Sequence, residues 1–144
     1  MAGAPEFEYT DELGKEICDT VACATSGLSK LCAARPHWPK KDTIYKWRVH
    51  IPSFAEQYAR ARLAQADVLA EDCTDIADDD SNDTLIDPET GQPRCNHEWI
   101  ARSKLRLDTR KWLAAKFLPK LYGDRQQVDT NVTINHEDTL KGLE

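Results

Sequence analysis

The sequence predicts a mainly α-helical protein with a small β element at its C-terminal end, and three observations carry this prediction. Amphipathic segments with helix-capping residues occupy most of residues 11–118. Proline and glycine divide these segments into short helices followed by two long ones. Residues 127–137 are the one stretch in which apolar and polar residues alternate convincingly with a period of two.

Three short helices are expected within residues 1–52. The first covers 11–25, where Leu13, Ile17 and Val21 share a face, and the others cover 30–35 and 40–50. Pro36, Pro39 and Pro52 stop the second and third helices, and the predicted N-caps are Thr10 or Asp11, Ser29 and Asp42. Short helices joined by tight connections are the layout of a helix-turn-helix domain.

Residues 53–122 are expected to form an antiparallel helical hairpin. Its first helix covers 53–80, and Ser53 and Glu56 have the spacing of a capping box. Its second helix runs from Asn96, a plausible cap, to Leu118. The polar, acidic connection between them is too short to be another domain, so the two helices should pack against each other.

The second long helix carries apolar residues on two nearly opposite arcs. One arc can face the hairpin partner, and the other needs a second partner, for which another copy of the chain is the economical choice. The alternative is that the N-terminal helices fold back to cover it. The candidate oligomerisation residues are Leu105, Leu107, Trp112, Ala114, Phe117 and Leu118.

Residues 123–144 are predicted to supply one strand to a β-barrel between subunits. The alternating inner face consists of Val128, Thr130, Val132 and Ile134. A lone strand is unstable in water, whereas identical strands from several copies could close into a barrel that leaves no free edge. The alternative is a disordered tail whose alternation is accidental.

The net charge of −6 hides a strong segregation along the chain. Residues 30–62 carry eight Lys/Arg against two acids and residues 99–125 carry eight against two, whereas residues 63–98 carry one against eleven. The first basic block coincides with the helix-turn-helix layout, which favours DNA over a merely solvated basic face or over pairing between the blocks. The candidate DNA-binding residues are Lys30, Arg35, Lys40, Lys41, Thr43, Lys46 and Arg48.

No catalytic constellation, cofactor site or metal site is expected. The sequence has no Gly-rich nucleotide loop, and its four histidines are dispersed. Residues 78–89 resemble a calcium loop, but Asp83 stands where the turn needs glycine, so a calcium-binding protein is only a remote alternative. Five cysteines without a CxxC pair argue against disulfides and a zinc ribbon, and we expect them to be reduced packing residues. No segment predicts a membrane span or a signal peptide, so the expected location is the cytoplasm.

Two stretches resemble the small terminase subunits of tailed bacteriophages. They are SKLCAARPHWPKKDTIYKWRVHIPSFAEQYARARLAQADVLAED (29–72) and, more specifically, KLRLDTRKWLAAKFLPKLYGDR (104–125). The resemblance covers about residues 10–135, and the acidic segment 78–101 departs from the family pattern by its length.

The resemblance implies a non-enzymatic DNA-recognition component of viral genome packaging. Such a protein assembles as a closed ring, with an octamer to decamer expected here, binds double-stranded viral DNA at the packaging site and delivers concatemeric DNA to the large terminase subunit. That partner carries the ATPase and nuclease, which the small subunit regulates. Lys30 and Lys46 match basic positions of the family's DNA-binding domain. The implied location is the host cytoplasm during assembly, with no place in the mature virion. A helix-turn-helix transcriptional regulator is the alternative, and a ring rather than a dimer would exclude it.

Overall fold

The computed structural model describes residues 7–124, and within them the chain is mainly helical, as predicted. The predicted barrel strand at 127–136 lies outside the described residues. The elements in chain order are α1 (Asp11–Ala22), α2 (Leu28–Ala33), α3 (Lys41–His50), α4 (Pro52–Asp78), β1 (Thr84–Ile86), β2 (Pro93–Cys95), α5 (His97–Phe117) and α6 (Pro119–Tyr122).

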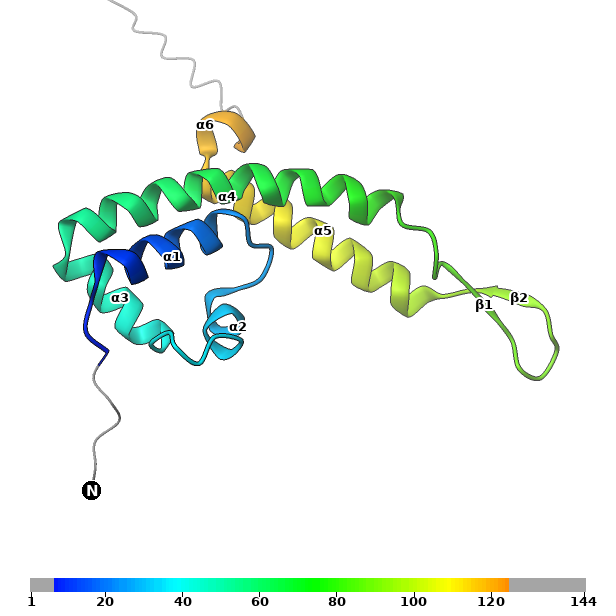
Figure 1. The fold of residues 1–144 in the computed structure, drawn as a ribbon. Coiled ribbons are helices and arrows are strands. Elements are labelled where there is room, and N and C mark those ends of the chain that lie inside the picture. Colours follow the sequence, from blue (N-terminus) through cyan, green and yellow to red (C-terminus); the bar gives the residue numbers. More distant parts are fainter. Residues whose placement is uncertain (1–6, 125–144) are drawn as a thin grey trace, which may run out of the picture.

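The long helix α4 is the common support of α1, α3 and α5 (Figure 1). The first half of α4 packs against α1 and α3, and α5 runs back along the second half. The predicted antiparallel hairpin is therefore confirmed. The strands β1 and β2 project from the far end of this hairpin, and α6 lies on the other side of α4 from α3.

The helix ends follow the predicted caps only in part. The Thr10 side chain accepts a hydrogen bond from the Leu13 N–H, and Asn96 does the same for Trp99, as a capping residue should. The other predicted caps are wrong, because α2, α3 and α4 have Gly27, Lys40 and Ile51 as N-caps, none with a side-chain hydrogen bond. In α4, Pro52 occupies the first turn, where its fixed φ fits a helix and its missing N–H costs nothing.

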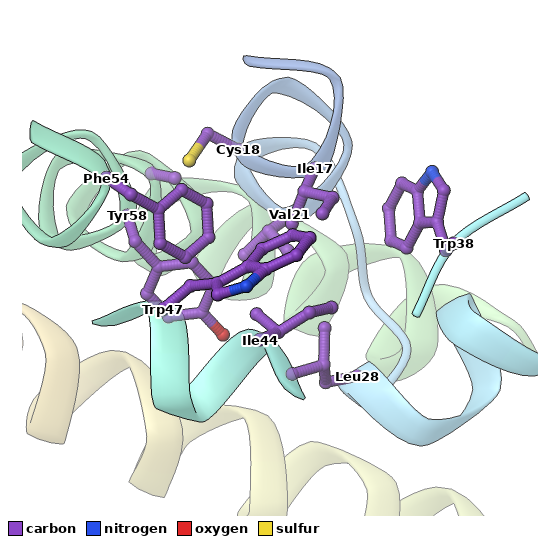
Figure 2. Close-up of a cluster of buried hydrophobic side chains, with 10 residues drawn as sticks. Ile17, Cys18, Val21, Leu28, Trp38, Ile44, Trp47, Phe54 and Tyr58 are labelled. Atoms are coloured by element: carbon purple, nitrogen blue, oxygen red, sulfur yellow. The ribbon is translucent and has the colours of Figure 1, made fainter. Parts of the chain in front are cut away.

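An aromatic core joins the N-terminal helices to α4. Ile17 and Val21 from α1, Ile44 and Trp47 from α3, and Phe54 and Tyr58 from α4 are all buried (Figure 2). The rings of Trp47 and Phe54 meet edge to face with centroids 6.1 Å apart. Because Phe54 and Tyr58 belong to α4, the hairpin and the N-terminal helices share one continuous helix.

The second half of α4 packs on α5 through apolar residues and one ion pair. Leu69 and Ile76 of α4 and Ala114 of α5 are buried. The Arg110 guanidinium on α5 donates a hydrogen bond to the Asp72 carboxylate on α4, and both side chains are largely shielded from water. This pair ties the two long helices at the middle of the hairpin.

The acidic connection contains a β-hairpin, which corrects the expectation that strand structure is confined to the stretch at 127–137. Thr84, Leu85 and Ile86 pair antiparallel with Cys95, Arg94 and Pro93. The reversal uses Gly91 in the left-handed region at φ 69°, where a side chain would be strained. The sequence pattern does not predict these strands. Both are short and exposed on both faces, so they show no alternation of apolar and polar residues.

The environments of the cysteines correct the expectation that all five are packing residues. All five thiols are free, but only Cys18 is buried, and Cys23 and Cys95 are exposed. In the described part of the chain, no helix combines the length and apolar character needed to cross a membrane.

Replacing Gly14 by alanine should destabilise the protein, because Tyr9 lies directly over this position of α1. An added Cβ would stand 2.5 Å from the Tyr9 hydroxyl oxygen and 2.8 Å from its ring, while Tyr9 is itself packed against Trp47 and Phe54. We expect Gly14→Ala to lower the free energy of unfolding by about 1–3 kcal/mol in chemical denaturation, as overpacking generally does.

Gly27→Ala is the matched control, since nothing lies within 4 Å of its added Cβ. The control should cost less than about 1 kcal/mol. Equal effects of the two substitutions would show that Tyr9 does not cover α1 in solution.

Candidate nucleic-acid interface

Helix α3 presents a basic, partly aromatic face to solvent. Ile44 and Trp47 turn inward, with 0% and 8% of their surface exposed, and this fixes the orientation of the helix. On its other side Lys46 and Arg48 are exposed, together with Tyr45 at 41% and Val49 at 77%. The exposed valine and tyrosine stand among cations, where they are able to contact bases or sugars.

The predicted DNA-binding residues fall into two groups. Lys30, Lys40, Lys41, Lys46 and Arg48 are exposed, whereas Arg35 and Thr43 are half-buried. The guanidinium of Arg35 lies 4.9 Å from the centroid of the Trp38 ring and donates a hydrogen bond to the Leu31 carbonyl at 3.2 Å. Arg35 is thus tied into the connection between α2 and α3, and the five exposed cations remain available to a ligand.

The start of α3 is free of a side-chain cap and borders a hollow. The Thr43 and Ile44 N–H groups bond to the Lys40 carbonyl, but no side chain caps the first turn. A hollow of about 340 Å³ beside it is lined by Ser29, Cys32, Ala33, Trp38, Pro39, Lys40, Lys41 and Asp42. A helix N-terminus with the Ser29 hydroxyl and two lysines beside it suits a phosphate group, against the one opposing charge of the Asp42 carboxylate.

A polar clamp holds the connection between α2 and α3 against α1. The Glu16 carboxylate accepts hydrogen bonds from His37 Nε2 at 2.6 Å and from Trp38 Nε1 at 2.9 Å. These bonds from His37 and Trp38 lower the pKa of the Glu16 carboxyl below its ordinary value of 4.5. The Trp38 indole is therefore fixed, and with it the entry of the chain into α3.

Arg48 belongs to a stack that reaches from α3 into the hairpin. Its guanidinium lies 4.7 Å from the Tyr58 ring centroid, and the Arg62 guanidinium lies 5.0 Å from the same ring. Arg62 also lies 5.1 Å from the Phe117 ring on α5 and donates hydrogen bonds to the Tyr58 hydroxyl and to Gln65, both at 2.6 Å. No sequence pattern indicates this stack, because its members come from three helices separated by Pro52 and by the acidic connection.

Gln65 lies at the junction between the N-terminal helices and the α4–α5 hairpin. Only 3% of its surface is exposed, and its side-chain amide donates to the Ala24 carbonyl, just after α1, at 2.9 Å. A buried amide is stable only when its donors and acceptors are paired, so this residue fixes α1 on α4.

The predicted oligomerisation residues divide into two sets. Ala114 is buried, and Leu107, Phe117 and Leu118 are half-buried, on the side of α5 that faces α4. Leu105 and Trp112 lie on the outer side, with 55% and 59% of their surface exposed. Their role in assembly stays a prediction, and the outer pair is the set that a second chain can reach.

The described residues offer no cluster suited to metal binding. Between residues 7 and 124, no three His, Cys, Asp or Glu side chains gather in a way that could hold a metal ion. Burial raises the pKa of the Cys18 thiol to about 11 and also raises those of Cys32 and Cys73, so these thiols are not activated nucleophiles.

Comparison with known proteins gives a family match and close structural matches. The family model described as "Bacteriophage Sf6, terminase small subunit-like" matches residues 9–129. Two crystal structures of point mutants of the terminase small subunit gp1 of the bacterial virus Sf6 are each 32% identical in sequence. They give TM-scores of 0.66 and 0.65, and the matches cover 83% of this chain and 80% and 85% of theirs. A search of curated proteins finds no match.

The Glu16 clamp should make stability depend on pH in the acidic range. Because the pKa of Glu16 is lowered in the folded state, its contribution is present above the ordinary value of 4.5 and is lost as pH falls through the folded-state pKa. Glu16→Gln keeps the shape and removes the charge. We expect its denaturation midpoint to lie below that of the original protein at pH 7 and the difference to shrink below about pH 4.5.

Glu12→Gln, an exposed carboxylate on the same helix, is the control and should show no such convergence. A pH-independent difference for Glu16→Gln would mean that the charge of Glu16 is not what holds the connection.

Proposed function

Since this chain belongs to the family of bacteriophage terminase small subunits similar to that of phage Sf6, we propose that it recognises the packaging site on concatemeric viral DNA. The general role, in the packaging of phage DNA, follows from the family. Terminase small subunits are non-enzymatic DNA-binding and regulatory proteins, and the proposed recognition is accordingly a matter of binding alone.

The exposed basic face of α3 is the observation that carries this proposal. Lys40, Lys41, Lys46 and Arg48 lie on or beside a helix whose inner face is locked into the core. Helices α2 and α3 act as a helix-turn-helix, in which the first turns of α3 enter the major groove and Lys30 on α2 contacts the backbone. Lysine and arginine contacts to phosphates supply most of the affinity, and Tyr45 and Val49 contact the bases or sugars.

The proposed working form is a closed ring of identical subunits, with residues 1–52 binding DNA and residues 53–122 holding the ring. The exposed Leu105 and Trp112 support this division, because a helix with two apolar sides needs two partners. Residues 123–144 supply the barrel strand, which the alternation of Val128, Val132 and Ile134 supports. The ring delivers DNA to the large terminase subunit in the host cytoplasm and regulates its ATPase and nuclease, without entering the mature virion.

DNA binding should depend on salt through Lys30 and Lys46. The double substitution Lys30→Ala with Lys46→Ala removes two phosphate contacts from each subunit, so the slope of log K against log salt concentration should fall by about two for every subunit that contacts the DNA. Fluorescence anisotropy with a duplex of the phage's packaging region, over a range of salt concentrations, measures this slope.

Lys15→Ala with Lys120→Ala removes the same charge from exposed positions on α1 and α6, and its slope should not change. Light scattering on each variant establishes that the assembly is intact. An unchanged slope for the first variant would rule out residues 30–50 as the DNA-binding site, and a dimer as the intact particle would favour a transcriptional regulator.

A further inference from the structure

The outer side of α5 combines exposed apolar and basic residues. Leu105 and Trp112 are more than half exposed, and the Lys116 ammonium lies 5.6 Å from the centroid of the Trp112 ring. Arg102 and Lys116 are exposed beside them. Among the described residues, neither of these two cations forms an ion pair within the chain, since the ion pairs of α5 are Arg110 with Asp72 and Lys104 with Asp108.

The outer side of α4 carries the opposite charge. After Arg62 this helix has no further Lys or Arg but has Asp67, Glu71, Asp72, Asp75 and Asp78. Asp72 turns inward to Arg110, whereas Glu71, Asp75 and Asp78 are exposed and have no ion-pair partner among the described residues. Leu63, which is 45% exposed, lies on the same side at helical spacing.

These two sides point away from the interface between α4 and α5. Leu69 and Ile76 of α4 and Ala114 of α5 are buried, and the two helices run side by side (Figure 1). Glu71 and Asp78 lie across α4 from Leu69, with Asp75 at the edge of the same acidic face, and Leu105 and Trp112 lie across α5 from Ala114. One chain therefore offers two different faces, a basic and apolar one on α5 and an acidic one on α4.

We propose that the basic apolar face of α5 (Arg102, Leu105, Trp112 and Lys116) packs on the acidic face of α4 (Leu63, Glu71, Asp75 and Asp78) of the next copy of this chain. The proposal rests on the ring proposed above and names the two faces that form it. Contacts between two different faces are heterologous, and they close into a ring when the rotation per subunit divides the circle. The occupant is a second copy because the charges of the two faces are complementary and their exposed leucines and tryptophan can be buried together.

A symmetric contact between two α5 helices is the competing arrangement. It would bring Arg102 and Lys116 of one copy close to the same cations of the other, and like charges in an interface are unfavourable. The head-to-tail arrangement avoids this repulsion and uses the acidic residues that the hairpin itself leaves unpaired.

Charge reversal on each face, measured by native mass spectrometry and light scattering of the full chain, tests the pairing. Glu71→Lys with Asp75→Lys should reduce the particle from the full assembly toward the 16.3 kDa monomer, and so should Arg102→Glu with Lys116→Glu. Mixing the two variants, or combining all four substitutions in one chain, should restore a large assembly because complementary charges then meet again.

Glu8→Lys with Glu12→Lys makes the same change of charge at exposed positions outside both faces and should leave the assembly intact. The milder pair Glu71→Gln with Asp75→Asn retains shape and should weaken the assembly if the reversal variants fold poorly, as circular dichroism would reveal.

The outcomes separate the two proposals. A monomeric original protein would overturn both the ring and the pairing of faces. A full assembly from each reversal variant would overturn the pairing and leave the ring standing. Loss of assembly in both variants without rescue on mixing would mean that the two faces do not meet each other.

Discussion

One side of α4 must be shielded from water along most of its length. This apolar stripe consists of Phe54, Tyr58, Ala66, Leu69 and Ile76. Among the described residues, no single helix covers that stripe. Helices α1 and α3 cover its first half and α5 covers its second half, so two structural units are built on one helix. The arrangement of the molecule follows from this division, because each partner helix buries one face on α4 and leaves its other face to solvent.

Midway along α4 the packing partner changes from α1 and α3 to α5, and polar as well as apolar contacts hold the helices together there. There the Arg62 guanidinium lies between the rings of Tyr58 and Phe117, and Gln65 bonds to the end of α1. These groups satisfy their polar atoms within the junction, which makes their geometry specific, since a shifted helix would leave a buried amide unpaired. The same Tyr58 ring also carries Arg48 from α3, so the basic face and the hairpin share one aromatic support.

Sequence reasoning predicted the helices and the basic face, because apolar spacing and proline stops are local signals. It succeeded for the caps at Thr10 and Asn96, and failed where the backbone begins a helix without a side-chain cap, as at Lys40 and Ile51. It also missed the β-hairpin, whose strands are exposed on both faces, and the stack around Tyr58, which depends on tertiary contacts. For α5, periodicity revealed two apolar arcs, but only the position of Ala114 against α4 tells which arc is turned inward.

Helix α4 is continuous from the N-terminal helices into the hairpin, and this continuity couples the movement of one to the other. Between Pro52 and Arg62 the helix extends past the end of α5 by about 15 Å, at 1.5 Å per residue, and it carries α1 and α3 on that overhang. The overhang acts as a stiff lever arm, unlike a flexible linker, so a small rotation of the hairpin becomes a displacement of the basic face. Copies joined through their hairpins would hold these faces at a common angle, and DNA would have to follow the curvature that they set.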